Sequence, residues 1–181
     1  DRLKPENQNV KALPYGFSLR FNGDDIRLYP ANHILGAAQV LVTDQRHSTR
    51  MLYTSDFKFP NTPVVKCDIL VMEATYGNPS HVRPFKGDVE RTFVELVQEK
   101  LKIGPVYIFG FYGKLQEAIQ ILREADVNCP MIMPERVLEI NKVYEKYGIN
   151  LGHCVLYPSD ESNTIIKSEK PYIGLYHSVL S

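Results

Sequence analysis

The sequence predicts an α/β protein with antiparallel hairpins in its first half and a mainly parallel sheet in its second half. Residues 15–53 alternate between apolar and polar types and contain tight-turn signals, which is typical of hairpins. Residues 88–176 alternate short apolar runs with helical patterns, which indicates a parallel sheet covered by helices. Apolar residues make up 44% of the 181 residues and charged residues 23%, the balance of a folded globular protein.

The first half is expected to contain two hairpins and one further strand. The hairpin strands are expected at residues 17–21, 26–29, 39–43 and 50–53. Asn22-Gly23 joins the first pair, because these residue types accept the positive φ angles of a tight turn. Residues 68–72 form a short continuous apolar run, which predicts a strand buried on both faces.

The second half is expected to alternate helices and strands. Helices are expected after the capping residue Asp88, over residues 114–125, and between Pro134 and Gly148. The first of these carries an apolar stripe of Val89, Phe93, Leu96, Val97 and Leu101. Strands are expected at residues 105–109, which should be buried, and at residues 130–133, 154–157, 164–167 and 172–176.

The change of pattern near residue 84 divides the chain into two predicted domains, residues 1–86 and 87–181. No apolar run approaches the roughly 20 residues that cross a bilayer, so we expect no membrane partner. The three cysteines, Cys67, Cys129 and Cys154, have no paired spacing. We interpret them as reduced, buried residues of a cytoplasmic protein. The formal charge is zero, so charge gives no support to a nucleic-acid partner.

Three ligand-type side chains follow predicted strands. His33, Asp56 and Glu73 each come at the carboxyl end of one. A sheet edge can hold metal ligands within the small tolerance that coordination requires. Each residue also has an ordinary use, since Asp56 could cap a turn and Glu73 could be a surface carboxylate. Spacing alone leaves the metal site and these ordinary uses equally open.

Four segments, taken in order, resemble motifs of one known family. Residues 30–40 (Pro-Ala-Asn-His-Ile-Leu-Gly-Ala-Ala-Gln-Val) resemble the third motif of the metallo-β-lactamase superfamily, in its nuclease branch. Residues 53–57 (Tyr-Thr-Ser-Asp-Phe) resemble the fourth motif. Residues 68–77 are similar to the strand and turn that open the β-CASP subgroup, and residues 106–117 to its later strand, turn and helix. The resemblance is to exonucleases found beside DNA ligases and to mRNA 3′-end processing nucleases.

This resemblance implies a partial metallo-β-lactamase sandwich, built of antiparallel hairpins, joined to a small β-CASP-like α/β domain. It implies a zinc-dependent phosphodiesterase acting on RNA or single-stranded DNA, of the RNA 3′-end processing or exonuclease type. His33 would bind one zinc ion, Asp56 would bridge two, and Glu73 would orient a neighbouring catalytic histidine. The His-x-His-x-Asp-His motif that supplies most ligands in the family is absent from this sequence, so we expect an N-terminally truncated chain. Because two ligands cannot hold two metal ions, the chain alone is expected to be nearly inactive, with both zinc ions held only in the intact parent protein.

The segment 111–114 suggests a nucleic-acid contact. Tyr112, Gly113 and Lys114 precede a predicted helix, whose first backbone N–H groups attract phosphate. Lys114 adds a positive charge, and Tyr112 could stack on a base. The alternative is a plain strand-to-helix turn in which Gly113 relieves strain.

A second hypothesis is a non-catalytic nucleic-acid-binding or interaction fragment of the same fold. A hydrolase of another substrate on this scaffold is a third, which the β-CASP-like second half disfavours. Losing part of the sandwich would expose apolar surface on the hairpin sheet. We therefore expect some self-association, or disorder near the N-terminus.

Overall fold

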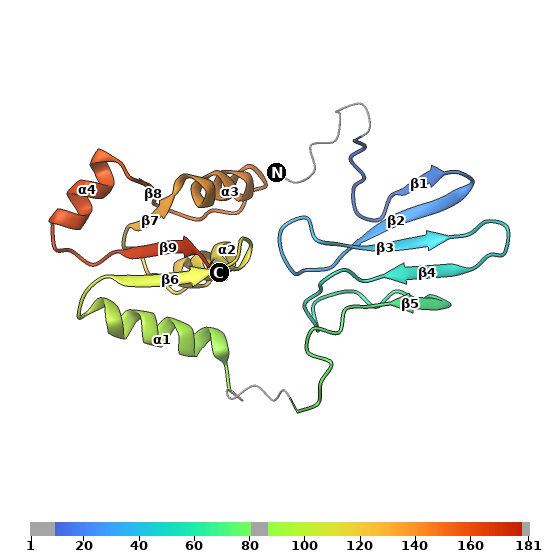
Figure 1. Cartoon of the computed structure of the whole chain (residues 1–181), viewed down its shortest axis with the longest axis horizontal. Coiled ribbons are helices and arrows are strands. Elements are labelled where there is room, and N and C mark those ends of the chain that lie inside the picture. The colour runs from blue at the N-terminus through green and yellow to red at the C-terminus, as the bar shows by residue number, and fades with distance from the viewer. Residues whose placement is uncertain (1–9, 81–86, 179–181) are drawn as a thin grey trace. The chain divides into compact units, whose positions relative to one another are not determined.

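The computed structural model describes residues 10–80 and 87–178 (Figure 1). The chain divides into two compact units, here called unit 1 (Asp1–Pro79) and unit 2 (Ser80–Ser181). Each contains one sheet, and the predicted α/β character is confirmed. Most of the expected domain boundary, residues 81–86, lies outside the described residues, as do the first nine residues, for which disorder was expected.

Unit 1 contains a five-stranded sheet, here called sheet A, with its strands in chain order. Its strands are β1 (Ser18–Phe21), β2 (Asp24–Pro30), β3 (Ala38–Thr43), β4 (Arg50–Tyr53) and β5 (Ile69–Val71). Both predicted hairpins are confirmed, and Phe21 pairs with Asp24 across the first turn. Asn22 and Gly23 form that turn with φ angles of 51° and 93°, as its sequence predicts. β5 pairs with β4 in parallel.

The prediction that residues 68–72 are buried on both faces is wrong. Ile69, Leu70 and Val71 are 48%, 53% and 46% exposed, and Met72 is 53% exposed. The reason is position, because β5 is the edge strand of sheet A and pairs only with β4. An apolar run of this length predicts a strand, but it does not say how many layers cover it.

One face of sheet A is apolar across all five strands. The pairing register aligns alternate residues of the strands on this side, here called the apolar face: Leu19, Phe21, Ile26, Leu28, Val40, Val42, Met51, Tyr53, Ile69 and Val71. None of these side chains is buried. The opposite face carries the buried Leu41 and Leu52.

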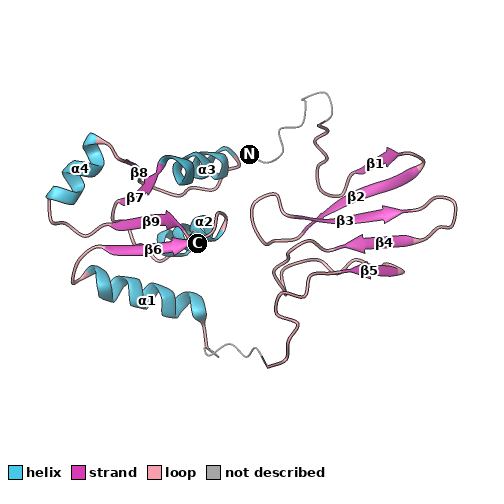
Figure 2. Cartoon of the chain, in the orientation of Figure 1, coloured by secondary structure: helices cyan, strands magenta, loops and turns pink. Residues whose placement is uncertain are grey.

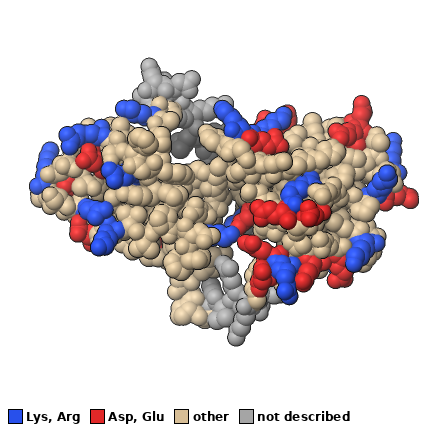
Figure 3. All heavy atoms as spheres, turned by 180° about the vertical axis from the view of Figure 1, so that it is seen from behind, with Lys and Arg blue, Asp and Glu red and all other residues tan. Residues whose placement is uncertain are grey.

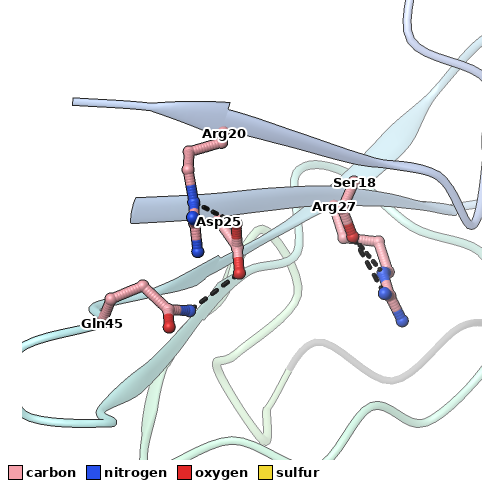
Figure 4. A network of polar contacts seen from close by, with 5 residues as sticks. All are labelled: Ser18, Arg20, Asp25, Arg27 and Gln45. Carbon is pink, nitrogen blue, oxygen red and sulfur yellow. Dashed lines mark hydrogen bonds and ion pairs between the residues drawn. The ribbon is translucent and has the colours of Figure 1, made fainter. Parts of the chain in front are cut away.

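A polar network also lies on that opposite face of sheet A (Figure 4). Arg20 Nε lies 3.4 Å from Asp25 Oδ1, and Gln45 Nε2 donates to Asp25 Oδ2 over 2.8 Å. Arg27 donates to Ser18 Oγ through two nitrogens, at 3.0 and 2.9 Å. The two faces of the sheet therefore differ: these polar pairs lie on one face, and on the apolar face Asp24 is the one charged residue of the five strands.

Unit 2 contains a parallel four-stranded sheet, here called sheet B, with four helices (Figure 2). The strands are β6 (Val106–Gly110), β7 (Met131–Pro134), β8 (Cys154–Tyr157) and β9 (Ile173–His177), in the spatial order β6-β9-β7-β8. The helices are α1 (Val89–Leu101), α2 (Lys114–Glu124), α3 (Glu135–Lys146) and α4 (Asp160–Lys167).

The helix boundaries follow the predicted signals. Asp88 caps α1 by accepting a hydrogen bond from Arg91 N over 3.0 Å. Gly148 follows α3 with a φ of 84°, the left-handed conformation that ends a helix. In the predicted stripe of α1 only Val97 is buried, and Val89 and Leu96 are 49% and 52% exposed. No described helix is both long and apolar enough to cross a membrane.

Two strand predictions in unit 2 need correction. Residues 105–109 were expected to be buried, but Tyr107 and Phe109 are 50% and 67% exposed, whereas Val106 and Ile108 on the other face are partly buried. In the described part of unit 2, helices cover only one face of this strand. Residues 164–167 were expected to be a strand and instead end α4. Ser159 starts that helix by accepting from Ser162 N, while Ser162 Oγ accepts from Ser159 N. This capping box outweighs the strand preference of the following residues.

The helices cover sheet B unequally. The crossovers through α2 and α3 run in one direction across the sheet, and the crossover through α4 runs back. Because such crossovers are right-handed, α2 and α3 cover one face and α4 lies on the other. Ile165 of α4 packs against Ile132 and Val155, in β7 and β8. Among residues 87–178 the second face is therefore covered over β7 and β8, and no helix covers it over β6 and β9.

The core lies mainly in unit 2, on the face covered by α2 and α3. Its most deeply buried apolar residues include Leu115, Ile119, Leu122, Met131, Met133, Val137, Ile173 and Leu175. The cysteines Cys67, Cys129 and Cys154 are free, as predicted, but only half-buried. Burial raises the pKa of the Cys129 and Cys154 thiols, so both remain protonated near neutral pH.

Candidate functional site

The three predicted ligand residues of unit 1 all follow strands that finish at the same end of sheet A. β2 and β4 are both antiparallel to β3, and β5 is parallel to β4, so all three have the same direction. His33 follows β2, Asp56 follows β4 and Glu73 follows β5. The sequence prediction of a common edge is thus matched by the topology, and their chemical roles remain predictions.

Hydrogen bonds join the loops that follow β4 and β5. Thr54 N donates to Val71 O over 3.0 Å, and Phe57 N donates to Glu73 Oε1 over 3.3 Å. Glu73 N donates to Thr54 Oγ1 over 3.4 Å. The Glu73 carboxylate therefore holds the residue directly after Asp56.

The loop that follows β2 is tied to the same connection. Ala31 O accepts from Lys58 N at 3.1 Å and from Thr62 Oγ1 at 2.6 Å. Asn32 Nδ2 donates to Asn61 O over 2.6 Å. The two residues before His33 are therefore both held by residues 58–62: Ala31 through its carbonyl oxygen and Asn32 through its side chain.

Each of the candidate ligands His33 and Asp56 is preceded by a residue in the left-handed backbone conformation. Asn32 and Ser55, directly before His33 and Asp56, have φ angles of 51° and 56°. This conformation is uncommon outside glycine and turns the chain sharply. Both turns come immediately after a strand, so the next side chain leaves the path of its strand.

The pKa of Glu73 is lowered by its hydrogen bonds and, to a smaller extent, by His33. The hydrogen bond from Thr75 Oγ1, 2.6 Å long, lowers the pKa of Glu73, and it outweighs the desolvation that raises it. The N–H of Phe57 and the imidazole of His33 lower the same pKa further. Glu73 is therefore held ionised, in the field of His33 and next to the Asp56 segment.

The described residues alone do not provide a metal centre. No group of three or more His, Cys, Asp or Glu residues within the described part of the chain is placed to hold a metal ion. His33 and Asp56 have suitable donor atoms, but a zinc site takes at least three protein ligands. The present residues therefore do not fit two zinc ions by themselves, and a complete centre would need ligands from outside them.

The turn predicted to contact nucleic acid lies directly before α2, as expected, but its Gly113 N–H has a partner within the protein. Gly113 caps α2 with a φ of 87°, and its N–H donates to Gln116 Oε1 over 2.7 Å. That N–H is therefore occupied, and the expectation that it is available to phosphate is wrong. Lys114 Nζ lies 2.8 Å from Glu117 Oε2 with its side chain 48% exposed, so its charge is partly compensated.

Sequence reasoning missed a buried amide pair behind this turn. Gln116 Nε2 donates to Asn141 Oδ1 over 2.8 Å, and both residues are at most 1% exposed. Asn141 Nδ2 in turn donates to Met133 Sδ and Cys154 Sγ. Among the described residues, the signal in the sequence was one polar residue on the buried side of each helix: Gln116 next to Leu115 in α2, and Asn141 one turn after Val137 in α3. Such buried amides need partners and so fix the elements that carry them.

Sequence reasoning also missed the surroundings of His177. Its ring lies 4.2 Å from the ring centroid of Tyr112 and 5.6 Å from that of Phe111. The end of β9 thus supports the two aromatic residues that precede Gly113. Elsewhere charge is mixed, and the side of the molecule in Figure 3 has Lys and Arg interspersed with Asp and Glu.

Comparison with known proteins gives relatives over most of the chain. No family model matches this sequence. An uncharacterised protein in the lig 3′ region of Acidianus ambivalens is 37% identical over 140 residues, covering 76% of this chain and 99% of the relative. A protein of Methanocaldococcus jannaschii named a probable RNase is 32% identical over 165 residues, and the transcription termination factor FttA of Methanothermobacter thermautotrophicus is 32% identical over 136 residues. These matches cover 81% and 67% of this chain, but only 38% and 21% of those two relatives.

Proposed function

The chain belongs to the β-CASP nuclease group of the metallo-β-lactamase superfamily, and from this membership we propose that it forms part of a nuclease acting on RNA. The relatives named as RNases support RNA as the substrate class. The observation that supports the proposal is that His33, Asp56 and Glu73 follow three strands of the same direction, β2, β4 and β5, in sheet A. Single-stranded DNA is a further substrate of this proposal, tested in the same assay.

In this proposal unit 1 is part of the metallo-β-lactamase sandwich, and unit 2 is a β-CASP-like domain. His33 and Asp56 supply two zinc ligands, and the other ligands come from a segment that carries the His-x-His-x-Asp-His motif, which this sequence lacks. Zinc would supply a nucleophilic hydroxide and Lewis acidity at the phosphate. Glu73 keeps the Asp56 segment in place through the N–H of Phe57.

The test is cleavage of labelled RNA and single-stranded DNA by the full-length protein, with zinc content measured in parallel. We expect Asp56→Ala and His33→Ala each to lower the cleavage rate by about 100-fold or more, because losing even a supporting partner of a metal ligand costs roughly 10–100-fold. Both variants should also lower the zinc content.

The chain offers a matched control pair. Asp44 and His47 form an exposed ion pair, 2.6 Å long, in the loop between β3 and β4, at the opposite edge of sheet A from Asp56. Asp44→Ala and His47→Ala should leave cleavage unchanged. Equal rates for Asp56→Ala and Asp44→Ala would rule out the proposed centre.

A non-catalytic nucleic-acid-binding or interaction fragment is the second candidate. The absence of a three-ligand cluster among the described residues favours it. It predicts RNA binding by the full-length protein without zinc and without cleavage. In either case we propose Tyr112 and Lys114 as nucleic-acid contacts, with Gly113 shaping the turn between them.

We also propose that the apolar face of sheet A mediates self-association. Phe21, Met51, Tyr53, Ile69 and Val71 of this face are 42–61% exposed, and a contiguous exposed apolar patch marks an interaction surface. A cytoplasmic location is part of the proposal, because free cysteines suit a reducing compartment.

A further inference from the structure

A set of aromatic side chains occupies the open part of the second face of sheet B. These residues, here called the aromatic strip, are Tyr107, Phe109 and Tyr176 on the two strands and Phe111 directly after β6. Tyr172, which is 7% exposed and belongs to the core cluster of Ile132 and Val155, anchors one end of the strip. Tyr107 pairs with Gly174 and Phe109 pairs with Tyr176, in the two neighbouring strands β6 and β9. Ile132 pairs with Gly174 in the same register, so the strip lies on the face that α4 covers only over β7 and β8.

The rings of Tyr172, Tyr107, Tyr176 and Phe109 lie next to one another in that order. Tyr107 lies 6.1 Å from Tyr172 and 6.3 Å from Tyr176, and Phe109 lies 5.9 Å from Tyr176 in a stacked orientation. The hydroxyls of Tyr107 and Tyr172 are 2.7 Å apart, which fixes the first pair. The strip is therefore an ordered row of rings rather than scattered exposed residues.

Gly174 makes room for this row. A Cβ at position 174 would lie 2.7 Å from Cδ1 of the Tyr107 ring, and 3.0 Å from Cε2 of Tyr176. Tyr107 can lie over β9 only because residue 174 has no side chain. Yet Tyr107, Phe109 and Phe111 remain 50%, 67% and 50% exposed, so their ring surfaces are available to a ligand.

The charges around the strip suit a polyanion. Residues 102–116 and 170–178, which contain β6, β9 and their ends, include no Asp or Glu. Lys102 and Lys170 come before the two strands at their amino ends, and Lys114 comes after β6 at its carboxyl end. Within these two segments the path thus has Lys102 and Lys170 toward one end and no carboxylate, and at the other end Lys114 is paired with Glu117.

We infer that the aromatic strip is a base-stacking surface for single-stranded RNA. Flat aromatic side chains exposed on a sheet stack bases without reading their sequence, and lysines track the phosphates. The strip continues through Phe111, which contacts His177 beside Tyr112, so it would extend the nucleic-acid contact proposed for that turn. This inference rests on the proposed function for its ligand class.

The experiment measures binding of fluorescein-labelled 12-nucleotide oligouridylate to the full-length protein by anisotropy, in the Asp56→Ala background to prevent cleavage. Phe109→Leu should weaken binding about fivefold or more, the lower range for loss of one stacked base. Leucine keeps an apolar side chain, and Phe109 is exposed on an edge strand, so the fold should be unaffected. Binding of an abasic oligonucleotide of equal length should not change.

A second readout uses the intrinsic fluorescence of the protein. The sequence contains 11 Tyr and no Trp, so tyrosine emission is directly visible. Oligouridylate should quench it, and Tyr107→Leu should reduce the quenching. Tyr147→Leu is the matched control, because Tyr147 is 69% exposed at the end of α3, outside the strip.

The outcomes separate this inference from the proposed function. Unchanged RNA affinity in both Phe109→Leu and Tyr107→Leu overturns the strip, whatever the cleavage assay gives. If either variant changes the sedimentation behaviour and not the RNA affinity, the strip is a protein interface and the inference is wrong. Loss of cleavage in Asp56→Ala with strip-dependent binding supports both, and cleavage that survives Asp56→Ala removes the proposed centre but not the strip.

Discussion

Sheet A and sheet B differ in how well their apolar side chains are covered. In unit 1 the buried apolar side chains among the described residues are Ala31, Leu41 and Leu52. Unit 2 has a core between α2, α3 and sheet B whose central side chains are fully buried. An apolar sheet face needs a second layer, and within the described part of the chain sheet B has one over a whole face while sheet A does not.

The well-packed core and the candidate ligand residues therefore lie in different units. The packed unit has the material to fold by itself, whereas the ligand residues His33, Asp56 and Glu73 belong to the sheet with an open apolar face. Covering that face should therefore stiffen the edge that carries them. Matched substitutions in the two units test this contrast, and the largest expected effect is on the free energy of unfolding.

The same substitution should have very different costs in the two units. Ile119 is fully buried in α2 and Ile69 is 48% exposed in β5. We expect Ile119→Ala to lower the free energy of unfolding by about 2–5 kcal/mol, and Ile69→Ala by less than about 1 kcal/mol. Urea unfolding followed by circular dichroism measures both, and equal losses would contradict the contrast.

Breaking the buried amide pair should weaken unit 2 alone. Gln116→Leu leaves the N–H of Gly113 and the Oδ1 of Asn141 without their partner, which should cost about 1–3 kcal/mol. The double variant with Asn141→Leu should recover part of this loss, because one unsatisfied group is removed. Simple additivity of the two single losses, again in urea, would count against a coupled pair.

A charge on the apolar face should weaken self-association. Val71 lies on this face, and the adjacent Leu70 lies on the opposite face of β5 with similar exposure. We expect Val71→Lys to weaken association by roughly tenfold or more, because an interface would bury the charge without a partner. Leu70→Lys should have little effect. Sedimentation equilibrium compares them, and the proposal fails if the two variants associate equally well.

The smallest expected effect concerns Glu73. Its pKa lies below the ordinary value of 4.5, chiefly because Thr75 donates to it. Ionised Glu73 therefore contributes stability above pH 4.5 that is lost as the pH falls through the lowered pKa. This contribution should be only a few tenths of a kcal/mol, since the group is largely open to solvent.

Thr75→Val tests the cause directly. Removing the hydroxyl should raise the pKa of Glu73 toward 4.5, as measured by NMR titration of its side-chain carboxyl carbon. An unchanged titration midpoint would show that Thr75 is not the main cause.

The sequence predicted those features that depend on local chemistry. The Asn22-Gly23 hairpin and the Gly148 helix end follow from positive φ angles that few other residues adopt. The Asp88 cap follows from a short side chain that accepts a hydrogen bond from the first turn of α1. The common edge of His33, Asp56 and Glu73 was also predictable, because each follows an apolar strand pattern.

Features that depend on distant layers were not predictable from the residues alone. The exposure of Ile69 and Phe109 depends on which faces of their strands are covered by another layer, and the sequence of a strand does not show this. The same holds for the site, where the contact between Glu73 and Phe57 N depends on the parallel pairing of β5 with β4. Gln116 and Asn141 meet through the packing of α2 on α3, and their separation in the chain gives no sign of it.

The parallel pairing of β4 and β5 has a consequence for which lengths of chain this fold tolerates. Parallel neighbours cannot be joined by a tight turn, so residues 54–68 must run back along the sheet, and this return carries Asp56. Three hydrogen bonds hold this return segment: Lys58 N and Thr62 Oγ1 donate to Ala31 O, and Pro63 O accepts from Gln39 Nε2. An insertion there would displace a candidate ligand, whereas the exposed hairpin loop at residues 44–49 can lengthen at little cost. Natural variation in length should therefore accumulate in the hairpin loop and be rare in the return.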